Sequence, residues 1–265
     1  MKKYNIALTI AGTDPSGGAG IQADLKAFSA CGCYGTSAIT ALVDQNTMGV
    51  KSVLPIPIQF VADQIRSVME DTGADAIKIG MLHSAELVAK VQETLSEYPL
   101  QNIVLDPVMV ATSGDTLLEE SAVEKLKKQL IPCVRVITPN IPEAEVLLGE
   151  KIENQDDLPY YAKKLAEEYT VSVLLKAGHL TRNELVDIFY NYETQETLRL
   201  PSQRLYTPNT HGTGCTLSSA LAAFLARGFA LNDAVVQAKK YISEALSAGA
   251  DYTIGKGHGP VHHFY

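Results

Sequence analysis

The feature that most constrains the fold is a regular exchange of short apolar runs with longer segments of helical period. Runs such as Ile103–Leu105 are apolar without alternation, as in parallel strands that are covered on both faces. Six apolar side chains of one intervening segment share a helical face: Ile58, Val61, Ala62, Ile65, Val68 and Met69. This order favours an α/β fold of three layers, a mainly parallel central sheet with helices on both faces.

The pattern predicts positions for the individual elements. The expected strands are Asn5–Ala11, Thr36–Val43, Ala76–Ile79, Asn102–Leu105, Val134–Thr138, Val171–Leu175 and Leu185–Tyr190. Further helices are expected over Asp156–Glu168, over Cys215–Arg227, and from a cap at Asn232 to about Ser247. Leu185–Leu200 has the pattern of a hairpin or an edge feature. Since no linker interrupts this order, we expect residues 1–265 to form one domain.

Charge and cysteine content exclude several classes of protein. The 265 residues include 22 Lys and Arg against 30 Asp and Glu, a net charge of −8, without a basic run. This argues against a nucleic-acid surface and against a polybasic membrane contact. No apolar stretch reaches the roughly 18 residues of a membrane span. Four cysteines in a chain of this length do not make a disulfide framework, so we expect a reducing, cytoplasmic environment.

Polar residues gather where the expected strands end, which is the edge at which sheets of this kind bind ligands. They are Thr13, Asp14, Asp44, Gln45, Asn46, Gly80, Met81, Asp106, Asn140, Glu143 and Lys176. Taken singly, such a residue is often only a turn former or a helix cap. Small, acidic, amide or cationic groups that follow six strands are less easily explained as turns and caps alone. Together they predict a ligand-binding site at this edge of the sheet.

Some of these residues suit a cation or a phosphate. The oxygens of Asp106, Asn140 and Glu143 are hard ligands for a Mg²⁺ ion that keeps part of its water, although Asn140 and Asp106 also suit helix caps. Lys176 ends a strand expected to be buried, so its ammonium needs a counter-charge. A phosphate and a structural carboxylate both remain open as that partner.

Two glycine-rich loops suit anion binding, one over Gly12–Gly20 and one over His211–Thr216. Glycines let several N–H groups point at one anion, and a following helix adds its positive end. Neither loop has the Gly-Lys-Ser/Thr ending of a P-loop. A tight loop–helix junction is the alternative for the second loop.

A nucleotide-dependent oxidoreductase is a rival interpretation of the first loop. Gly18, Gly20 and Ala23, with Asp44 after the next strand, form a loose dinucleotide fingerprint. The true fingerprint starts at the strand end, whereas here several residues intervene. The rival also leaves the second loop unused.

Cys215 is the most specific single candidate for a catalytic residue. At a helix N-terminus we expect its thiol pKa to be depressed, so that it accepts a proton or acts as a nucleophile. A small side chain packed into a crowded turn is the alternative.

Together these motifs resemble the ribokinase-like superfamily, and more narrowly the bacterial hydroxymethylpyrimidine/phosphomethylpyrimidine kinases of thiamine biosynthesis. The resemblance spans Ile6 to Phe264. It is carried by the segments Leu8–Lys26, Lys78–Leu82, Asp106–Met109, Thr138–Asn140 with Glu143, His211–Thr216 and Gly259–His263.

The resemblance implies a ribokinase-like fold and two ATP- and Mg²⁺-dependent steps. The hydroxymethyl group of 4-amino-5-hydroxymethyl-2-methylpyrimidine is phosphorylated, and the monophosphate is then phosphorylated again. It also implies a cytoplasmic homodimer.

The resemblance also assigns roles to residues. Asp24 and Gln45 would hydrogen-bond the pyrimidine, in a slot lined by Gly12, Val43, Met81 and Val108. Lys176, Asn140 and Glu143 would serve ATP, and Asp106 and Glu143 would hold Mg²⁺ partly through water. Gly212, Thr213, Gly214 and Cys215 would cradle the transferred phosphoryl group, with Cys215 as the base. The related sugar kinases place an Asp at the position of Cys215, which makes this role of the cysteine less secure.

Three points stay open. A pyridoxal kinase shares the loops and the cysteine, and Gln45 is the position expected to separate the two activities, although one chain could have both. A pyrimidine sensor without catalysis is a further alternative, against which Lys176 and Cys215 speak. Whether a flap closes over the site is the third open point, and Asp14–Gly18 and the region of Ser113, Gly114 and Asp115 are the flexible candidates for it.

Overall fold

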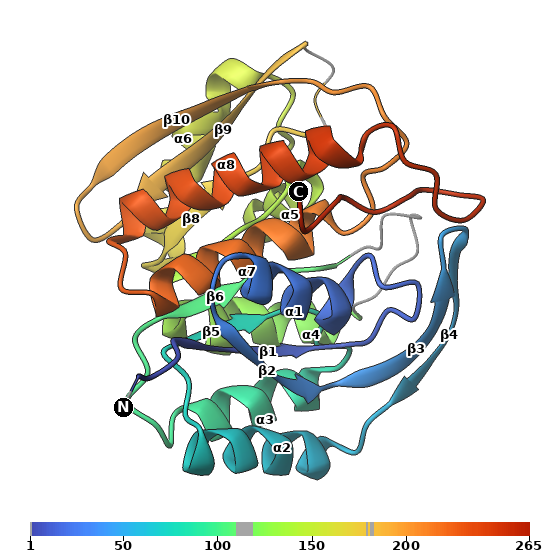
Figure 1. Ribbon diagram of the computed structural model, residues 1–265. Helices are drawn as coiled ribbons and strands as arrows, with labels where there is room; N and C mark the ends of the chain where they lie inside the picture. The colour runs from blue at the N-terminus through green and yellow to red at the C-terminus, as the bar shows by residue number, and fades with distance from the viewer. Residues whose placement is uncertain (1, 110–118, 179, 181–182) are drawn as a thin grey trace.

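The computed structural model describes residues 2–109, 119–178, 180 and 183–265. Its centre is an eight-stranded sheet in the order β10-β9-β8-β7-β6-β5-β1-β2 (Figure 1). The strands are β1 (Ile6–Ala11), β2 (Tyr34–Ile39), β5 (Ala76–Ile79), β6 (Ile103–Leu105), β7 (Val136–Ile137), β8 (Ser172–Leu175), β9 (Glu184–Asn191) and β10 (Glu196–Gln203). The strands from β2 to β8 in this order are parallel, and β9 is antiparallel to both of its neighbours. The predicted mainly parallel sheet is confirmed.

Helices cover both faces of this sheet (Figure 1). One layer contains α1 (Gly20–Ala30), α7 (Thr213–Ala226) and α8 (Leu231–Gly249). The other contains α2 (Ile58–Asp71), α3 (Ala85–Leu95), α4 (Glu120–Lys125), α5 (Ile141–Leu148) and α6 (Leu158–Tyr169). Because side chains alternate across a strand, Ala76 packs in the α7 layer whereas Ile77 and Ile79 pack in the α2–α6 layer. The three layers predicted from the sequence are confirmed.

The strand predicted over Thr36–Val43 is wrong as one element. The chain leaves the central sheet at Thr40, whose N–H donates to Ala11 O at 2.9 Å and whose Oγ1 donates to Met81 O at 3.0 Å. Beyond it, β3 (Ala41–Asn46) pairs with β4 (Gly49–Pro55) in a separate two-stranded sheet. The largely exposed β4 carries no continuous apolar run, which is why the sequence pattern missed it.

Two further boundaries differ from the prediction. Asn232 does not cap α8, because this helix begins at Leu231 and the Asn232 side chain instead accepts from Asn191 Nδ2 at 2.6 Å. The strand expected over Val134–Thr138 shortens to the two residues of β7. The hairpin or edge feature expected over Leu185–Leu200 is confirmed as the β9–β10 pair.

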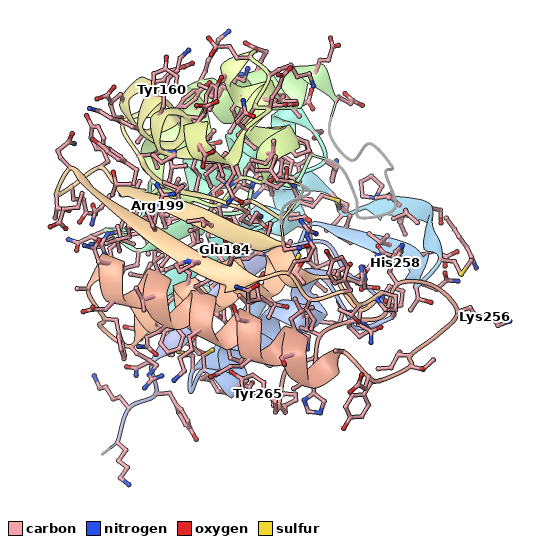
Figure 2. All side chains as sticks on the ribbon, turned by 90° about the horizontal axis from the view of Figure 1, so that it is seen from above. Tyr160, Glu184, Arg199, Lys256, His258 and Tyr265 are labelled. Carbon is pink, nitrogen blue, oxygen red and sulfur yellow. The ribbon has the colours of Figure 1, made fainter. Side chains whose placement is uncertain are left out.

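The C-terminal segment reaches back to the β3–β4 hairpin and to the loop before α7. His258 N–H donates to Thr47 O, and His211 N–H donates to Gly259 O, both at 3.0 Å. Figure 2 shows His258 on the same side of the molecule as the blue hairpin. Three segments far apart in the sequence therefore meet at one edge of the fold. Among the residues described, no helix has the length and apolar character needed to cross a membrane.

Candidate active site

The carboxyl ends of the parallel strands bring Asp106 and Lys176 into direct contact. Lys176 Nζ lies 3.0 Å from Asp106 Oδ1, which also accepts from Thr138 Oγ1 at 2.9 Å. The counter-charge that Lys176 requires is thus a carboxylate of the chain itself. Burial opposes ionisation of Asp106, but the Lys176 and Lys78 charges outweigh it, so the pKa of Asp106 lies below its ordinary value.

Asn140 and Glu143 form a capping box at the start of α5. Asn140 N–H donates to Glu143 Oε2 at 2.8 Å, and Glu143 N–H donates to Asn140 Oδ1 at 2.9 Å. The capping alternative is therefore correct for Asn140. Burial raises the pKa of Glu143 to about 7, against the pull of the Lys176 charge and with the Asp106 charge adding to the rise. Glu143 is poised to lose a proton when a cation approaches.

The second glycine-rich loop ends in a bare helix N-terminus. Gly212 is the N-cap of α7 with φ +75°, and a β-carbon there would collide with the carbonyl oxygen of Gly18. Within the described part of the chain, the backbone N–H groups of Gly214 and Cys215 donate to no other group. A β-carbon at Gly214 would lie 3.4 Å from both Asp106 Oδ2 and Lys176 Nζ. Two N–H groups without a partner among the described residues thus lie near this ion pair, an arrangement that can bind an anion.

The first glycine-rich loop is different, because its N–H groups are already used. Asp14 accepts from the N–H groups of Ser16 at 2.9 Å, Gly18 at 3.1 Å and Ala19 at 2.7 Å. His211 Nε2 lies 2.7 Å from the same carboxylate, whose pKa is held below its ordinary value. The anion in this loop is Asp14 itself, so the prediction of an external anion there is wrong.

This arrangement also bears on the other predictions for the first loop. The amides that a dinucleotide would need are occupied by Asp14, which speaks against the oxidoreductase interpretation. Asp14–Gly18, one of the two candidate segments for a flap, is held by these bonds and by Lys26 Nζ, which donates to Gly17 O at 2.7 Å. The other, around residues 113–115, lies outside the described residues.

Cys215 occupies the first turn of α7, as predicted, but its thiol does not have the expected depressed pKa. Burial raises the pKa of Cys215 to about 11; the Lys78 charge opposes this rise, and the Asp24 and Asp106 carboxylates add to it. The loss of water and the two nearby carboxylates therefore outweigh the Lys78 charge.

Three of the predicted slot residues lie together. A β-carbon at Gly12 would lie 2.8 Å from Met81 Cε and 3.6 Å from Val43 Cγ2, so only a residue without a side chain leaves this space open. Val108 is half-buried just beyond β6, and its place in the slot stays a prediction.

Gln45 lies on β3, with its Nε2 3.4 Å from His211 Nε2. His211 Nε2 must donate to the Asp14 carboxylate, so it cannot also accept from the Gln45 amide. The Gln45 amide is therefore free to bind a ligand.

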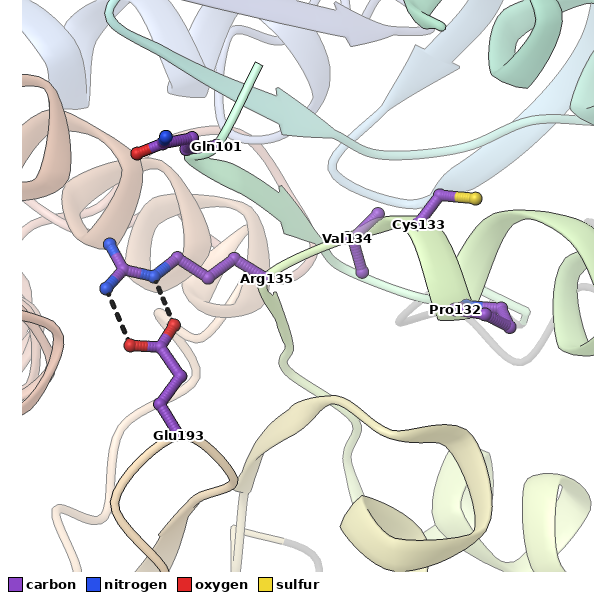
Figure 3. A pocket seen from close by; sticks show the side chains of 6 residues that line it. All are labelled: Gln101, Pro132, Cys133, Val134, Arg135 and Glu193. Carbon is purple, nitrogen blue, oxygen red and sulfur yellow. Dashed lines mark hydrogen bonds and ion pairs between the residues drawn. The ribbon is translucent and has the colours of Figure 1, made fainter. Parts of the chain in front are cut away.

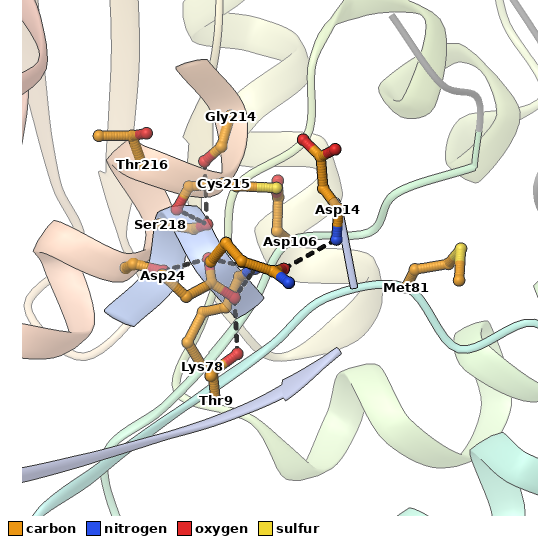
Figure 4. A network of polar contacts seen from close by, with 12 residues as sticks. Thr9, Asp14, Asp24, Lys78, Met81, Asp106, Gly214, Cys215, Thr216 and Ser218 are labelled. Atoms are coloured by element: carbon orange, nitrogen blue, oxygen red, sulfur yellow. Dashed lines mark hydrogen bonds and ion pairs between the residues drawn. The ribbon is translucent and has the colours of Figure 1, made fainter. Parts of the chain in front are cut away.

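Asp24 has a different environment from the one predicted. Its side chain is fully buried, and Lys78 Nζ lies 2.9 Å from both of its oxygens (Figure 4). Thr9 Oγ1 and Ser219 Oγ donate to this carboxylate as well, each at 2.6 Å. A contact between Asp24 and a ligand would require one of these bonds to open.

Sequence reasoning missed the parts played by Thr138, His211 and Lys78. Lys78 carried a signal that could have been used: it is the one charged residue in the strand Ala76–Ile79, and a lysine is rarely buried without a partner. His211 and Thr138 gave no comparable signal, because their partners are distant in the sequence.

A second hollow lies away from this site. Gln101, Pro132, Cys133, Val134, Arg135 and Glu193 line it (Figure 3). Arg135 directly precedes β7, so the hollow lies at the opposite edge of the sheet from Asp106 and Lys176. Arg135 Nε and Nη2 donate to Glu193 at 2.6 and 2.9 Å, which leaves this guanidinium neutralised.

Comparison with known proteins agrees with this geometry. The profile of the family described as phosphomethylpyrimidine kinase matches residues 14–262. The hydroxymethylpyrimidine/phosphomethylpyrimidine kinase of Escherichia coli K12 is 50% identical over 266 residues, which cover 100% of this chain and 99% of that protein.

Two solved structures extend the comparison to three dimensions. A phosphomethylpyrimidine kinase from Clostridium difficile 630 is 44% identical with a TM-score of 0.79, covering 91% of this chain and 98% of the other. A pyridoxal kinase from Bacillus subtilis in complex with ADP is 36% identical with a TM-score of 0.89, covering 98% of each chain. From the extent of these matches, the chain belongs to the phosphomethylpyrimidine kinase family.

Proposed function

We propose that this protein phosphorylates 4-amino-5-hydroxymethyl-2-methylpyrimidine with ATP, and then phosphorylates the resulting monophosphate to the diphosphate. The observation that carries the proposal is the pair of free N–H groups at Gly214 and Cys215 beside the Asp106–Lys176 pair. Membership of the kinase family supports it.

The chemistry suits this arrangement. Phosphoryl transfer passes through a loose transition state, so catalysis depends on positioning and on donors aimed at the transferring oxygens. Gly212, Thr213, Gly214 and Cys215 form the cradle that supplies these donors. Lys176, with its pKa held above its ordinary value, stays cationic and would bind phosphate oxygens. Asn140 would serve ATP from the start of α5.

Mg²⁺ fits the donor set. Among the residues described, no three His, Cys, Asp or Glu side chains gather closely enough to form a metal cluster. Mg²⁺ usually takes only one or two carboxylates and keeps several waters. Asp106 and Glu143 would hold the ion, partly through water, and its charge would neutralise the triphosphate.

The acceptor pyrimidine would lie in the slot bounded by Gly12, Val43 and Met81, with Val108 at the border of this slot. The Gln45 amide would bind the edge of the pyrimidine ring. Cys215 would accept the hydroxyl proton. Only the thiolate form of Cys215 can take this proton, which converts it to the thiol as the substrate oxygen bonds to the phosphoryl group. Because burial raises the pKa of this thiol to about 11, the thiolate is a minor form near neutral pH, and the Lys78 charge favours it.

The test is turnover by the purified protein with ATP and Mg²⁺. The hydroxymethylpyrimidine, its monophosphate and pyridoxal are supplied separately, while ADP release and product mass are followed. Diphosphate formed from the monophosphate supports the two-step reaction. Turnover without any partner protein excludes the sensor, and the absence of turnover with all three substrates refutes the proposal.

Pyridoxal kinase is the second candidate, because ADP-bound and pyridoxal-bound structures of such enzymes share this fold at 32–36% identity. The discriminating residue is Gln45, whose amide can both donate to and accept from an aminopyrimidine edge. Gln45→Leu should raise KM for the pyrimidine at least tenfold and leave KM for ATP unchanged. Turnover of pyridoxal alone by the unaltered protein would overturn this role of Gln45.

A homodimer stays a prediction. The β3–β4 hairpin turns the cross-strand pair Leu42 and Leu54 outward, both exposed, which is the kind of apolar face a second copy would cover. Sedimentation equilibrium of the purified protein tests it, and a monomer at micromolar concentration would refute it.

A further inference from the structure

The buried ion pair between Asp24 and Lys78 has no part in the chemistry proposed above, although it lies next to the phosphate cradle (Figure 4). Both side chains are fully buried. A buried lysine on the central strand β5 is costly unless its partner is held in good geometry. Lys78 Nζ meets this condition, with both Asp24 oxygens at 2.9 Å.

The remaining bonds of the Asp24 carboxylate join α1 to two further elements, β1 and α7. Thr9 Oγ1 on β1 donates to Oδ2, and Ser219 Oγ on α7 donates to Oδ1, both at 2.6 Å. Ser219 follows Cys215 by four residues, so both lie on the same face of α7, one turn apart. The carboxylate therefore anchors the second turn of the helix whose first turn forms the cradle.

The charge of Lys78 also acts on the site itself. A β-carbon at Gly80 would lie 2.9 Å from Lys78 Nζ, which places the ammonium directly under the strand end. Besides Asp24, the Asp106 carboxylate raises the pKa of this ammonium, and the Cys215 thiol would do so when ionised. The lysine thus sits between the anchor of α7 and the groups of the reaction.

We propose that Asp24 and Lys78 are positioning residues for phosphoryl transfer, which act through Ser219 to hold the cradle amides over the Asp106–Lys176 pair. This inference rests on the proposed kinase activity. It replaces the expected contact of Asp24 with the pyrimidine. A change in this anchor should lower kcat and leave both KM values unchanged, because the substrates bind to other residues.

Ser219→Ala and Thr9→Val form a matched pair of variants. Each removes one hydroxyl that donates to Asp24 at 2.6 Å, but only Ser219 belongs to α7. A shift of catalytic groups by about 1 Å can cost 10²-fold in rate. We expect Ser219→Ala to lower kcat at least tenfold with KM values within twofold, and Thr9→Val to keep kcat within twofold. Equal kcat in the two variants, measured with thermal midpoints for both, overturns the proposal.

A double variant separates the anchor from direct substrate binding. Asp24→Asn with Lys78→Met removes both charges together, which buried pairs tolerate better than loss of one partner. The anchor predicts a fall in kcat of about 10²-fold at constant KM for the pyrimidine. A tenfold rise in this KM at constant kcat overturns the proposal, because Asp24 would then contact the substrate. Should this variant not fold, the Ser219 and Thr9 comparison decides. Absence of turnover in the unaltered protein would refute the proposed function instead.

Discussion

Replacing Glu143 by Gln should raise the free energy of unfolding of the ligand-free protein at pH 8 and lower its kinase activity. Glu143 is buried, and its pKa is raised to about 7 from an ordinary 4.5. A carboxyl group with a raised pKa favours the folded state when protonated, so the folded wild type loses stability as pH rises from about 4.5 through 7. The neutral Gln resembles the protonated acid and keeps an oxygen for the Asn140 N–H.

The magnitude follows from the shift. At about 1.4 kcal/mol per pKa unit, the variant should gain about 3 kcal/mol at pH 8 and only about 1 kcal/mol at pH 5.5. Urea unfolding at the two pH values measures this difference, and one transition is expected from a single domain. ADP with Mg²⁺ should stabilise wild type more than the variant, since a cation favours the ionised carboxylate.

Glu145→Gln on the same helix is the control. Glu145 is bound by Lys151 at 2.7 Å and by the Ile152 N–H at 2.9 Å, so its pKa lies below the ordinary value. The ionised Glu145 carboxylate stabilises the folded protein at neutral pH, and this stabilisation is lost on acidification. Glu145→Gln should therefore destabilise the folded protein at pH 8. If Glu143→Gln also destabilises at pH 8, or its effect is the same at both pH values, the electrostatic reasoning is wrong.

Three further changes probe other parts of the site. Cys215→Ala should lower kcat by about 10²–10⁴ if the thiol accepts the proton; a loss below about tenfold with an unchanged circular-dichroism spectrum would remove it as the base. Gly12→Ala places a β-carbon 2.8 Å from Met81 Cε, so KM for the pyrimidine should rise at least tenfold while KM for ATP stays constant; an unchanged pyrimidine KM would show that the slot lies elsewhere. Asp14→Asn removes the charge that holds three loop amides and His211, and limited proteolysis should then cut the first glycine-rich loop faster than in wild type; equal cutting rates would contradict the role of Asp14 as an internal anion.

The sequence supported much of the fold and part of the candidate site. Parallel strands covered on both faces leave an unbroken apolar run, so β5 and β6 could be found within a residue of their bounds. Because the carboxyl ends of such strands share one edge, Asp106 and Lys176 could be expected together before any contact was known. The roles of these residues in phosphoryl transfer remain predictions.

Other features depend on contacts between distant residues, and only the tertiary structure decided them. A carboxylate after a strand has the same local pattern whether it binds a ligand or its own loop, yet Asp14 binds the amides of the first loop, whereas the N–H groups of Gly214 and Cys215 have no partner among the described residues. The pKa of Cys215 rises because burial outweighs the nearby Lys78 charge, and burial is a property of the whole packed chain. Local sequence determined which elements form, because periodicity acts over a few residues. Packing decided which polar groups were left without a partner, because that depends on every element that surrounds them.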